Sequence, residues 1–208
     1  MAKLLIATKN PAKFKNFARL LAGYNFDIVS LADIGVAVGV VETGTTFEEN
    51  AKLKAKAYFD LTQLPTLVDD SGLAIDALGG WPGLYSRRVW GPDKPEATDE
   101  EARAEVLKRL ADIPDGKRQA HFIVVAALAM PDRQVYTATF SVDGVISREP
   151  RGTLSPGFPY RTIFYLPQYG KTAAELEAEG NHDNYLNHRK NAIMKFDNYL
   201  KQLEDHAQ

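Results

Sequence analysis

Apolar runs of strand length alternate with segments of helical character along the 208 residues. The apolar runs are short and rich in Leu, Ile, Val and Ala, which favours buried β-strands. They cover residues 3–8, 26–30, 66–68, 120–130 and 134–142. The two longest runs flank Pro131-Asp132-Arg133, which predicts a β-hairpin. Helical spacing and helix-start signals favour helices elsewhere. The expected helices cover residues 11–22, 46–61, 99–111, 171–176 and 187–203.

The first two expected helices carry clear start signals. Asn10 is placed to cap the first helix, and Pro11 suits its first position, where no amide hydrogen is needed. Thr46 and Glu49 have the spacing of a capping box at the start of the second helix. Glu42 lies just before this box, and we place it at the end of a further apolar, strand-like stretch at residues 36–41.

The start of the first helix is a candidate anion site. A strand, a short polar loop and a helix N-terminus together expose backbone amides at the positive end of the helix dipole. Lys9, Lys13 and Lys15 surround this turn, where cations oppose the dipole unless an anion is near. The pattern G-x-x-x-x-G-K-[ST] of a P-loop is missing from the sequence. A basic turn in solvent is the alternative, and phosphate binding is the interpretation that we favour.

Two adjacent carboxylates form the strongest candidate for chemistry. Asp69-Asp70-Ser71-Gly72 follows residues 66–68, which we expect to end a buried strand. Successive strand side chains point to opposite faces, so Asp69 and Asp70 cannot both face the core. Paired acids at a strand end suit Mg²⁺, which prefers oxygen ligands. The same residues also suit an Asx-type turn, and the local sequence leaves both interpretations open.

Two loops have a composition that suits ligand binding. Residues 79–88 contain Gly-Gly-Trp-Pro-Gly, which is incompatible with regular secondary structure. Residues 150–167 form a long irregular segment rich in glycine, proline and aromatic residues. For residues 79–88, a surface loop whose aromatic side chains pack inward is the alternative.

Composition excludes several classes of protein. The net charge of −2 argues against a general nucleic-acid or membrane surface, so any positive site must be local. The chain has no cysteine, which excludes disulfides, zinc–thiolate sites and a cysteine nucleophile. The longest apolar run is too short to span a bilayer. A strand-like run begins directly after the first residues, which is not typical of a signal peptide, so we expect a cytoplasmic protein.

Taken together, these motifs resemble the inosine triphosphate pyrophosphatase family, also described as Ham1-like or aberrant purine NTP pyrophosphatases. The resemblance extends over nearly the whole chain, and the order and spacing of the motifs agree. The matching segments are residues 7–13, 42–51, 54–55, 69–73, 83–86, 150–152, 157–158, 170–172, 174–176 and 188–189.

The resemblance implies an α/β fold, with an elongated mixed β-sheet flanked by helices. It implies a single ITPase-like domain over residues 1–208, with two lobes and a central nucleotide-binding cleft. It further implies a homodimer that hydrolyses non-standard purine triphosphates (ITP, dITP and XTP) to the monophosphate and pyrophosphate with Mg²⁺, removing damaged nucleotides from the precursor pool. Two alternatives stay open: the same reaction with another base preference, and a nucleotide-binding protein without turnover.

The resemblance also implies roles for individual residues. Glu42 and Asp70 would hold Mg²⁺, with Asp69 as a further candidate ligand, and Asp70 would also act as the catalytic base. The residues expected to bind substrate are Thr8, Lys9, Asn10, Lys13, Lys54, Ser71, Phe158, Pro159, Tyr160, Arg161, Asp183, His188 and Arg189. Of these, the residues up to Lys54 would serve the triphosphate, and Phe158, Tyr160, His188 and Arg189 would serve the base.

The sequence departs from the family pattern near the expected base pocket. The family's Gly-Phe-Gly-Tyr-Asp-Pro loop reads Gly157-Phe158-Pro159-Tyr160-Arg161-Thr162 here. Asp183 stands where the family usually has a lysine, five residues before the histidine. Arg161 and Asp183 would form a reversed charge pair, from which we hypothesise an altered base preference. Neutral drift, with pocket geometry kept by backbone contacts, explains the change equally well.

Overall fold

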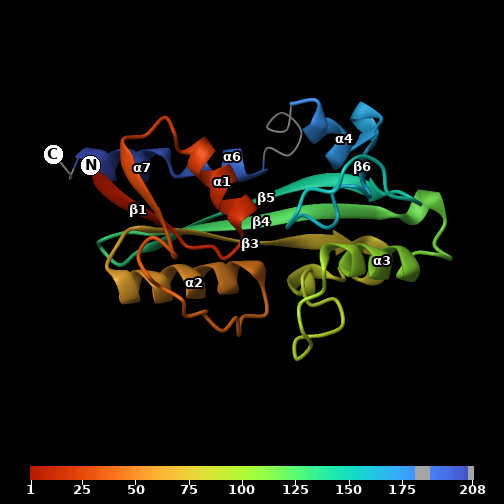
Figure 1. The fold of residues 1–208 in the computed structure, drawn as a ribbon, viewed down its shortest axis with the longest axis horizontal. Helices are drawn as coiled ribbons and strands as arrows, with labels where there is room; N and C mark the ends of the chain where they lie inside the picture. Colours follow the sequence, from red (N-terminus) through yellow and green to blue (C-terminus); the bar gives the residue numbers. More distant parts are fainter. Residues whose placement is uncertain (181–187, 206–208) are drawn as a thin grey trace. The chain divides into compact units, whose positions relative to one another are not determined.

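Seven strands form one mixed sheet in the order β2-β1-β3-β4-β5-β6-β7 (Figure 1). The computed structural model describes residues 1–180 and 188–205. β1 pairs in parallel with β2 and β3, and β6 pairs antiparallel with β5 and β7. The strands are β1 (Ala2–Ile6), β2 (Phe26–Ser30), β3 (Thr66–Ile75), β4 (Gln119–Ala129), β5 (Val135–Ile146), β6 (Phe164–Leu166) and β7 (Lys171–Thr172). A mixed sheet with flanking helices confirms the expected α/β class.

Contacts divide the chain into two compact units, to which β3, β4 and β5 each contribute residues. Unit 1 comprises Met1–Asp70, Val124–Phe140 and Arg189–Gln208. Unit 2 comprises Ser71–Ile123 and Ser141–His188.

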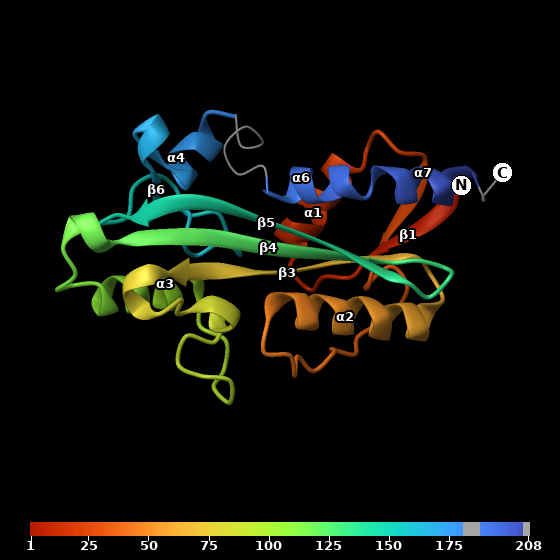
Figure 2. The ribbon, with the colours of Figure 1, turned by 180° about the vertical axis from the view of Figure 1, so that it is seen from behind.

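Helices cover both faces of the unit 1 strands (Figures 1 and 2). One face carries α2 (Phe47–Thr62), whose Ala51, Ala55 and Phe59 pack into a core with β-strand residues. The other face carries α1 (Pro11–Leu20), α6 (His188–Lys195) and α7 (Asp197–Asp205). Phe17 and Phe196 are fully buried in this second core. The two cores fix α1 and α2 against the strands that carry the candidate acids.

Unit 2 has a separate core built from β-strand residues and two helices. The helices are α3 (Asp99–Arg109) and α4 (Ala173–Ala178). Single 3₁₀ turns η1 (Asp76–Leu78), η2 (Gly83–Tyr85), η3 (Asp115–Lys117) and η4 (Pro167–Tyr169) connect the elements. Phe164 and Leu176 lie at the centre of the core, so the irregular residues before β6 are anchored at their C-terminal end.

The local start signals and the hairpin are confirmed. The Asn10 side chain accepts hydrogen bonds from the amides of Ala12 and Lys13 at the start of α1. Thr46 and Glu49 form a complete capping box at the start of α2. β4 and β5 are neighbours in the sheet, and the turn between them places Arg133 at φ 66°.

Three sequence expectations about secondary structure are wrong. β3 does not end at residue 68; it continues to Ile75, because Leu73 and Ile75 return to the buried face beyond the polar residues. The expected final helix is two helices, α6 and α7, separated at Phe196, where the amide donates to the Ile193 carbonyl in a tighter turn.

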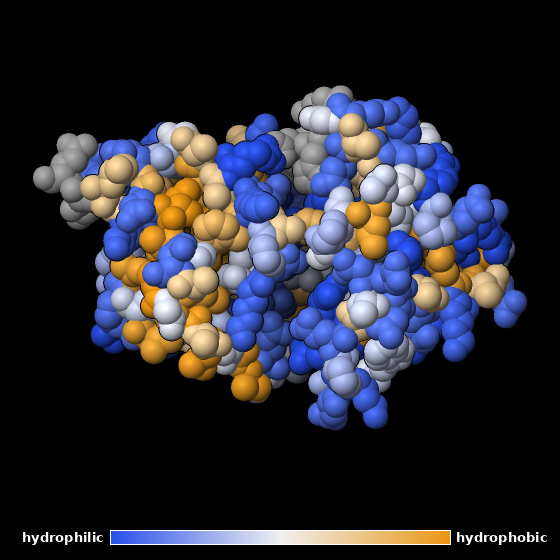
Figure 3. Space-filling model, in the orientation of Figure 1, coloured by the Kyte–Doolittle hydropathy of each residue, from blue (hydrophilic) through white to orange (hydrophobic). Residues whose placement is uncertain are grey.

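The third correction concerns residues 36–41, which form an irregular segment instead of a strand. Val38 and Val41 are 68% and 76% exposed, so their side chains do not pack into a core as strand residues would. Figure 3 shows hydrophobic side chains gathered on the surface of unit 1. Within the described part of the chain, no helix is both long enough and apolar enough to cross a membrane.

Candidate functional site

The turn between β1 and α1 is ordered by its own polar side chains. Thr8 Oγ1 accepts a hydrogen bond from the Asn10 amide at 3.2 Å. Asn10 Oδ1 accepts from the amides of Ala12 and Lys13 at 2.9 and 3.3 Å. These contacts fix the first turn of α1 and therefore the position from which the Lys13 side chain extends. Lys9 lies in the same turn, two residues before Pro11, the first residue of α1.

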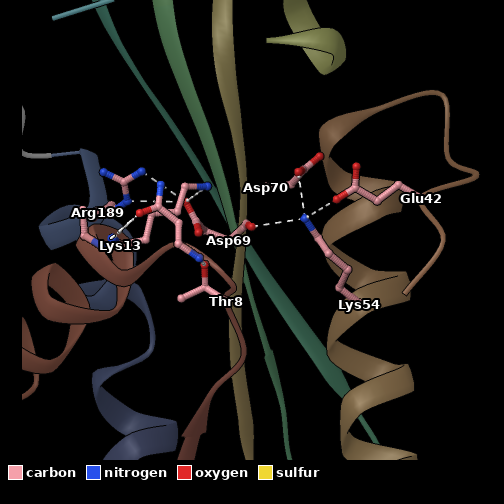
Figure 4. Close-up of polar contacts among 9 residues, drawn as sticks. Thr8, Lys13, Glu42, Lys54, Asp69, Asp70 and Arg189 are labelled. Carbon is pink, nitrogen blue, oxygen red and sulfur yellow. Dashed lines mark hydrogen bonds and ion pairs between the residues drawn. The ribbon is translucent and has the colours of Figure 1, made fainter. Parts of the chain in front are cut away.

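Lys13 and Arg189 meet on the carboxylate of Asp69 (Figure 4). Lys13 Nζ is 3.1 Å and Arg189 Nη2 is 3.2 Å from the same oxygen, Oδ2. The Asp69 side chain is fully buried. Burial alone would raise the pKa of Asp69, but Lys13 and Arg189 outweigh it and hold the pKa far below its usual range. Asp69 is therefore ionised, and its carboxylate contacts both cations at one oxygen.

A second cluster joins the carboxylates of Glu42 and Asp70 through Lys54. Lys54 Nζ lies 2.8 Å from Asp70 Oδ1, 3.1 Å from Glu42 Oε1 and 3.3 Å from the Asp69 carbonyl oxygen. Burial lowers the pKa of Lys54, but Asp70 and Glu42 raise it above its ordinary value. Burial raises the pKa of Asp70, and the Lys54 ammonium only partly offsets that effect.

The strand geometry of β3 separates the two clusters. Asp69 and Asp70 are successive residues of one strand, so their side chains leave it on opposite faces. Figure 4 shows Asp69 directed to Lys13 and Arg189, and Asp70 directed to Lys54 and Glu42. The expectation that the two acids face opposite ways is confirmed. Asp69, expected as a third metal ligand, lies instead among cations.

Glu42 and Asp70 have the chemistry of a magnesium site. Each directs one oxygen to the same ammonium nitrogen, so the two oxygens lie within about 6 Å of one another. Among residues 1–180 and 188–205, no three His, Asp or Glu side chains are grouped to hold a metal ion. Mg²⁺ is commonly held by only one or two carboxylates together with waters and substrate phosphates. The carboxylates of Glu42 and Asp70 therefore fit the group that the resemblance implies.

The unit 2 candidates form a separate polar arrangement around Arg161, which is buried. Its guanidinium carbon lies 3.6 Å from the centroid of the Phe158 ring, a cation–π contact. Arg161 Nη1 donates to Glu177 Oε1 at 2.5 Å, and Ser155 Oγ donates to Glu177 Oε2 at 2.5 Å. The Arg161 charge is thus balanced by Glu177 of α4. The expected partner, Asp183, lies outside the described residues.

Tyr160 and Pro159 are buried, unlike typical pocket-lining residues. The Tyr160 hydroxyl donates to the Ser86 carbonyl at 2.5 Å, and the ring belongs to the unit 2 core. Tyr160 therefore anchors residues 157–162 to the unit 2 core. Ser71 lies on β3, and His188 is buried at the first position of α6.

Sequence reasoning missed two residues that organise the loop. Glu177 binds Arg161, and Ser155 donates a hydrogen bond to Glu177. Neither residue belongs to a motif, and a carboxylate on a short helix normally indicates a solvated face. The only available signal was the unusual arginine itself, which requires an acceptor when it is buried.

The fold and this site define an α/β protein with a paired-carboxylate centre and a cationic helix start. The chain belongs to the Ham1 family, whose model matches residues 4–199. It is 41% identical over 203 residues to the dITP/XTP pyrophosphatase of Geobacillus kaustophilus, covering 98% of this chain and 96% of the relative. It is 44% identical over 195 residues to the enzyme of the same name from Escherichia coli, covering 93% and 95%.

Solved structures give the same result. The Ham1 protein of Staphylococcus aureus is similar with a TM-score of 0.79 at 32% identity, covering 96% of this chain and 98% of that one. A HAM1 protein from Coxiella burnetii is similar with a TM-score of 0.78 at 33% identity, covering 100% and 98%. Family membership confirms the resemblance that the sequence motifs indicated.

Proposed function

We propose that this chain is a Mg²⁺-dependent nucleoside triphosphate pyrophosphatase that converts ITP, dITP and XTP to the monophosphate and pyrophosphate. Relatives with dITP/XTP pyrophosphatase names, each covered over nearly its full length, support this assignment. The observation that carries it is the convergence of Glu42 and Asp70 on the ammonium of Lys54. This arrangement offers a divalent cation two carboxylate oxygens and offers a phosphate one cation.

The residues of unit 1 would perform the chemical step. Lys13 and the amides at the start of α1 bind the anionic tail, and the Thr8 hydroxyl can donate to a phosphate oxygen. Asp70 takes a proton from the attacking water, and its burial-raised pKa makes it a better base than an exposed aspartate. Lys54 stabilises the negative charge that develops on the departing pyrophosphate. Glu42 and Asp70 would hold Mg²⁺, which would supply further stabilisation of that charge when bound.

We further propose that residues 1–208 act as one domain, in which unit 2 supplies the base-binding residues. Phe158 offers an aromatic face on which a base can stack. A homodimer and a cytoplasmic location are part of the same proposal. A cysteine-free chain fits a reducing compartment, and the nucleotide pool is the substrate source. Sedimentation of the purified protein would test the dimer.

Pyrophosphate release from ITP, measured with Mg²⁺ and with EDTA, tests the activity. We expect IMP and pyrophosphate in equal amounts with Mg²⁺ and no turnover in EDTA. Asp70→Asn should abolish turnover while binding of ITP stays measurable by calorimetry. Binding without turnover by the unaltered protein would favour the non-catalytic alternative, and unchanged turnover by the variant would refute the role of Asp70.

An altered base preference is the second candidate, and Arg161 is the observation that favours it. A buried guanidinium stacked on Phe158 replaces the carboxylate that the family usually places there. A site built on hydrogen bonds can discriminate between bases by factors of about 10⁴. Turnover of ITP, XTP, GTP and pyrimidine triphosphates at one Mg²⁺ concentration decides the question. The usual preference for ITP and XTP would rule out the altered specificity.

A further inference from the structure

The Asp69 carboxylate faces two cations among the residues that the structure describes. Its side chain is fully buried, and Oδ2 contacts Lys13 Nζ and Arg189 Nη2. The other oxygen, Oδ1, is buried and has no hydrogen-bond partner among the described residues. Mg²⁺ keeps several of its waters when it binds to proteins. A carboxylate without solvent exposure leaves little room for such a hydrated ion, so Asp69 is poorly placed as a metal ligand.

The two cations come from distant parts of the sequence. Lys13 lies in the first turn of α1 and Arg189 near the start of α6, and both helices pack on the same core. Because both contact one oxygen, the two charged groups lie within about 6 Å of each other, where like charges repel. The Asp69 carboxylate offsets this repulsion and fixes both side chains at one point beside β3.

The two cations that contact Asp69 differ in their exposure to solvent. The Lys13 side chain is 19% exposed, whereas the Arg189 side chain is only 6% exposed. Lys13 is therefore the member of the cluster that a phosphate can reach, and Asp69 and Arg189 lie behind it.

We infer that Asp69 is a positioning residue, which holds Lys13 and Arg189 as one cationic cluster for the triphosphate and does not ligate the metal. This inference rests on the proposed function. It separates the two adjacent acids of β3 by role: Asp70 serves the metal and the water, and Asp69 serves the phosphate-binding cations.

Asp69→Asn tests the assignment because it keeps the shape and removes the charge. We expect the KM for ITP to rise about tenfold or more, the effect of losing one charge-assisted hydrogen bond, while kcat changes less than about threefold. The Mg²⁺ concentration for half-maximal rate should stay unchanged, whereas Glu42→Gln should raise it. Calorimetry with inorganic triphosphate in EDTA should show the same loss of affinity as the KM. Asp60→Asn, which removes the partner of Lys56 on the surface of α2, is the matched control and should change neither quantity.

A double-mutant cycle with Lys13→Gln shows whether Asp69 acts through Lys13. If it does, adding Asp69→Asn to Lys13→Gln should change the triphosphate affinity little. Additive losses, an unchanged or lowered KM in Asp69→Asn, or a raised Mg²⁺ requirement would each overturn the inference. If Asp69→Asn does not fold, Lys13→Gln and Arg189→Gln should each weaken triphosphate binding without altering the Mg²⁺ requirement, and a loss in only one of them would refute the shared cluster.

The calorimetric measurement also separates this inference from the proposed function. Inorganic triphosphate has no base and its binding requires no turnover. Absence of ITP hydrolysis by the unaltered protein would therefore refute the proposed function, while the binding comparison would still decide the role of Asp69.

Discussion

Replacing Lys54 by methionine removes the ammonium group that contacts both Glu42 and Asp70. Lys54 Nζ contacts both carboxylates, at 3.1 and 2.8 Å, and all three side chains are largely buried. Methionine keeps most of the side-chain volume, so the change is chiefly one of charge. The two acids are then left facing one another without a shared cation.

The expected cost follows from the separation of the two acids. Two carboxylate oxygens at most about 6 Å apart repel by at least about 3 kcal/mol at an effective dielectric constant of about 20. For a chain of this length, that loss corresponds to a fall in melting temperature of roughly 6–12 °C. Mg²⁺ would restore the missing positive charge, so most of the fall should disappear when the ion is present.

Thermal unfolding in EDTA and in Mg²⁺ measures this difference directly. Lys56→Met is the matched control, because Lys56 lies on the same helix and pairs with a surface acid, Asp60. The control should lose little stability in either condition, as is usual for exposed ion pairs. A Lys54→Met variant with the same loss in EDTA and in Mg²⁺ would refute the reasoning that Glu42 and Asp70 form the metal site.

Two further predictions concern unit 2. Glu177→Gln removes the charged partner of buried Arg161. We therefore expect a free energy of unfolding about 1–3 kcal/mol lower in denaturant and a higher KM for ITP. An unchanged KM would exclude the loop that carries Phe158 and Arg161 from base binding. His121 places one ring nitrogen 2.8 Å from Asp143 and the other 3.0 Å from Asp76, and the hydrogen bond to Asp143 is the main cause of its raised pKa. The folded pKa of His121 exceeds the unfolded value of about 6.5. The two acids therefore stabilise the folded protein fully below that value, and this contribution disappears as the pH rises through the folded pKa. The free energy of unfolding should therefore fall more between pH 6 and pH 9 in the unaltered protein than in His121→Gln, and equal falls would contradict the ion pairs.

Much of the fold was predictable wherever the signal is local. Asn10 and Thr46 each cap a helix through hydrogen bonds to amides two or three residues away, so the sequence alone indicates both helix starts. β3 was misjudged because Asp69-Asp70-Ser71-Gly72 suits a turn as well as a strand. Only the burial of Leu73 beyond these residues reveals that the strand continues.

The sequence indicates most residues of the site, but not which of them contact one another. The motifs placed Glu42, Lys54 and Asp70 in one site, and the structure brings their charged groups together. The contact between Asp69 and Arg189 joins residues 120 positions apart, so no spacing rule can indicate it. Asp69 therefore resembled a third metal ligand in the sequence.

The central claim is that Glu42 and Asp70 together hold the divalent ion that hydrolysis requires. Diffraction at the manganese absorption edge, from crystals grown with Mn²⁺ and pyrophosphate, tests it most directly. The account predicts one anomalous peak within about 2–2.5 Å of a carboxylate oxygen from each of Glu42 and Asp70. A peak on Asp69, or none between Glu42 and Asp70, would contradict it.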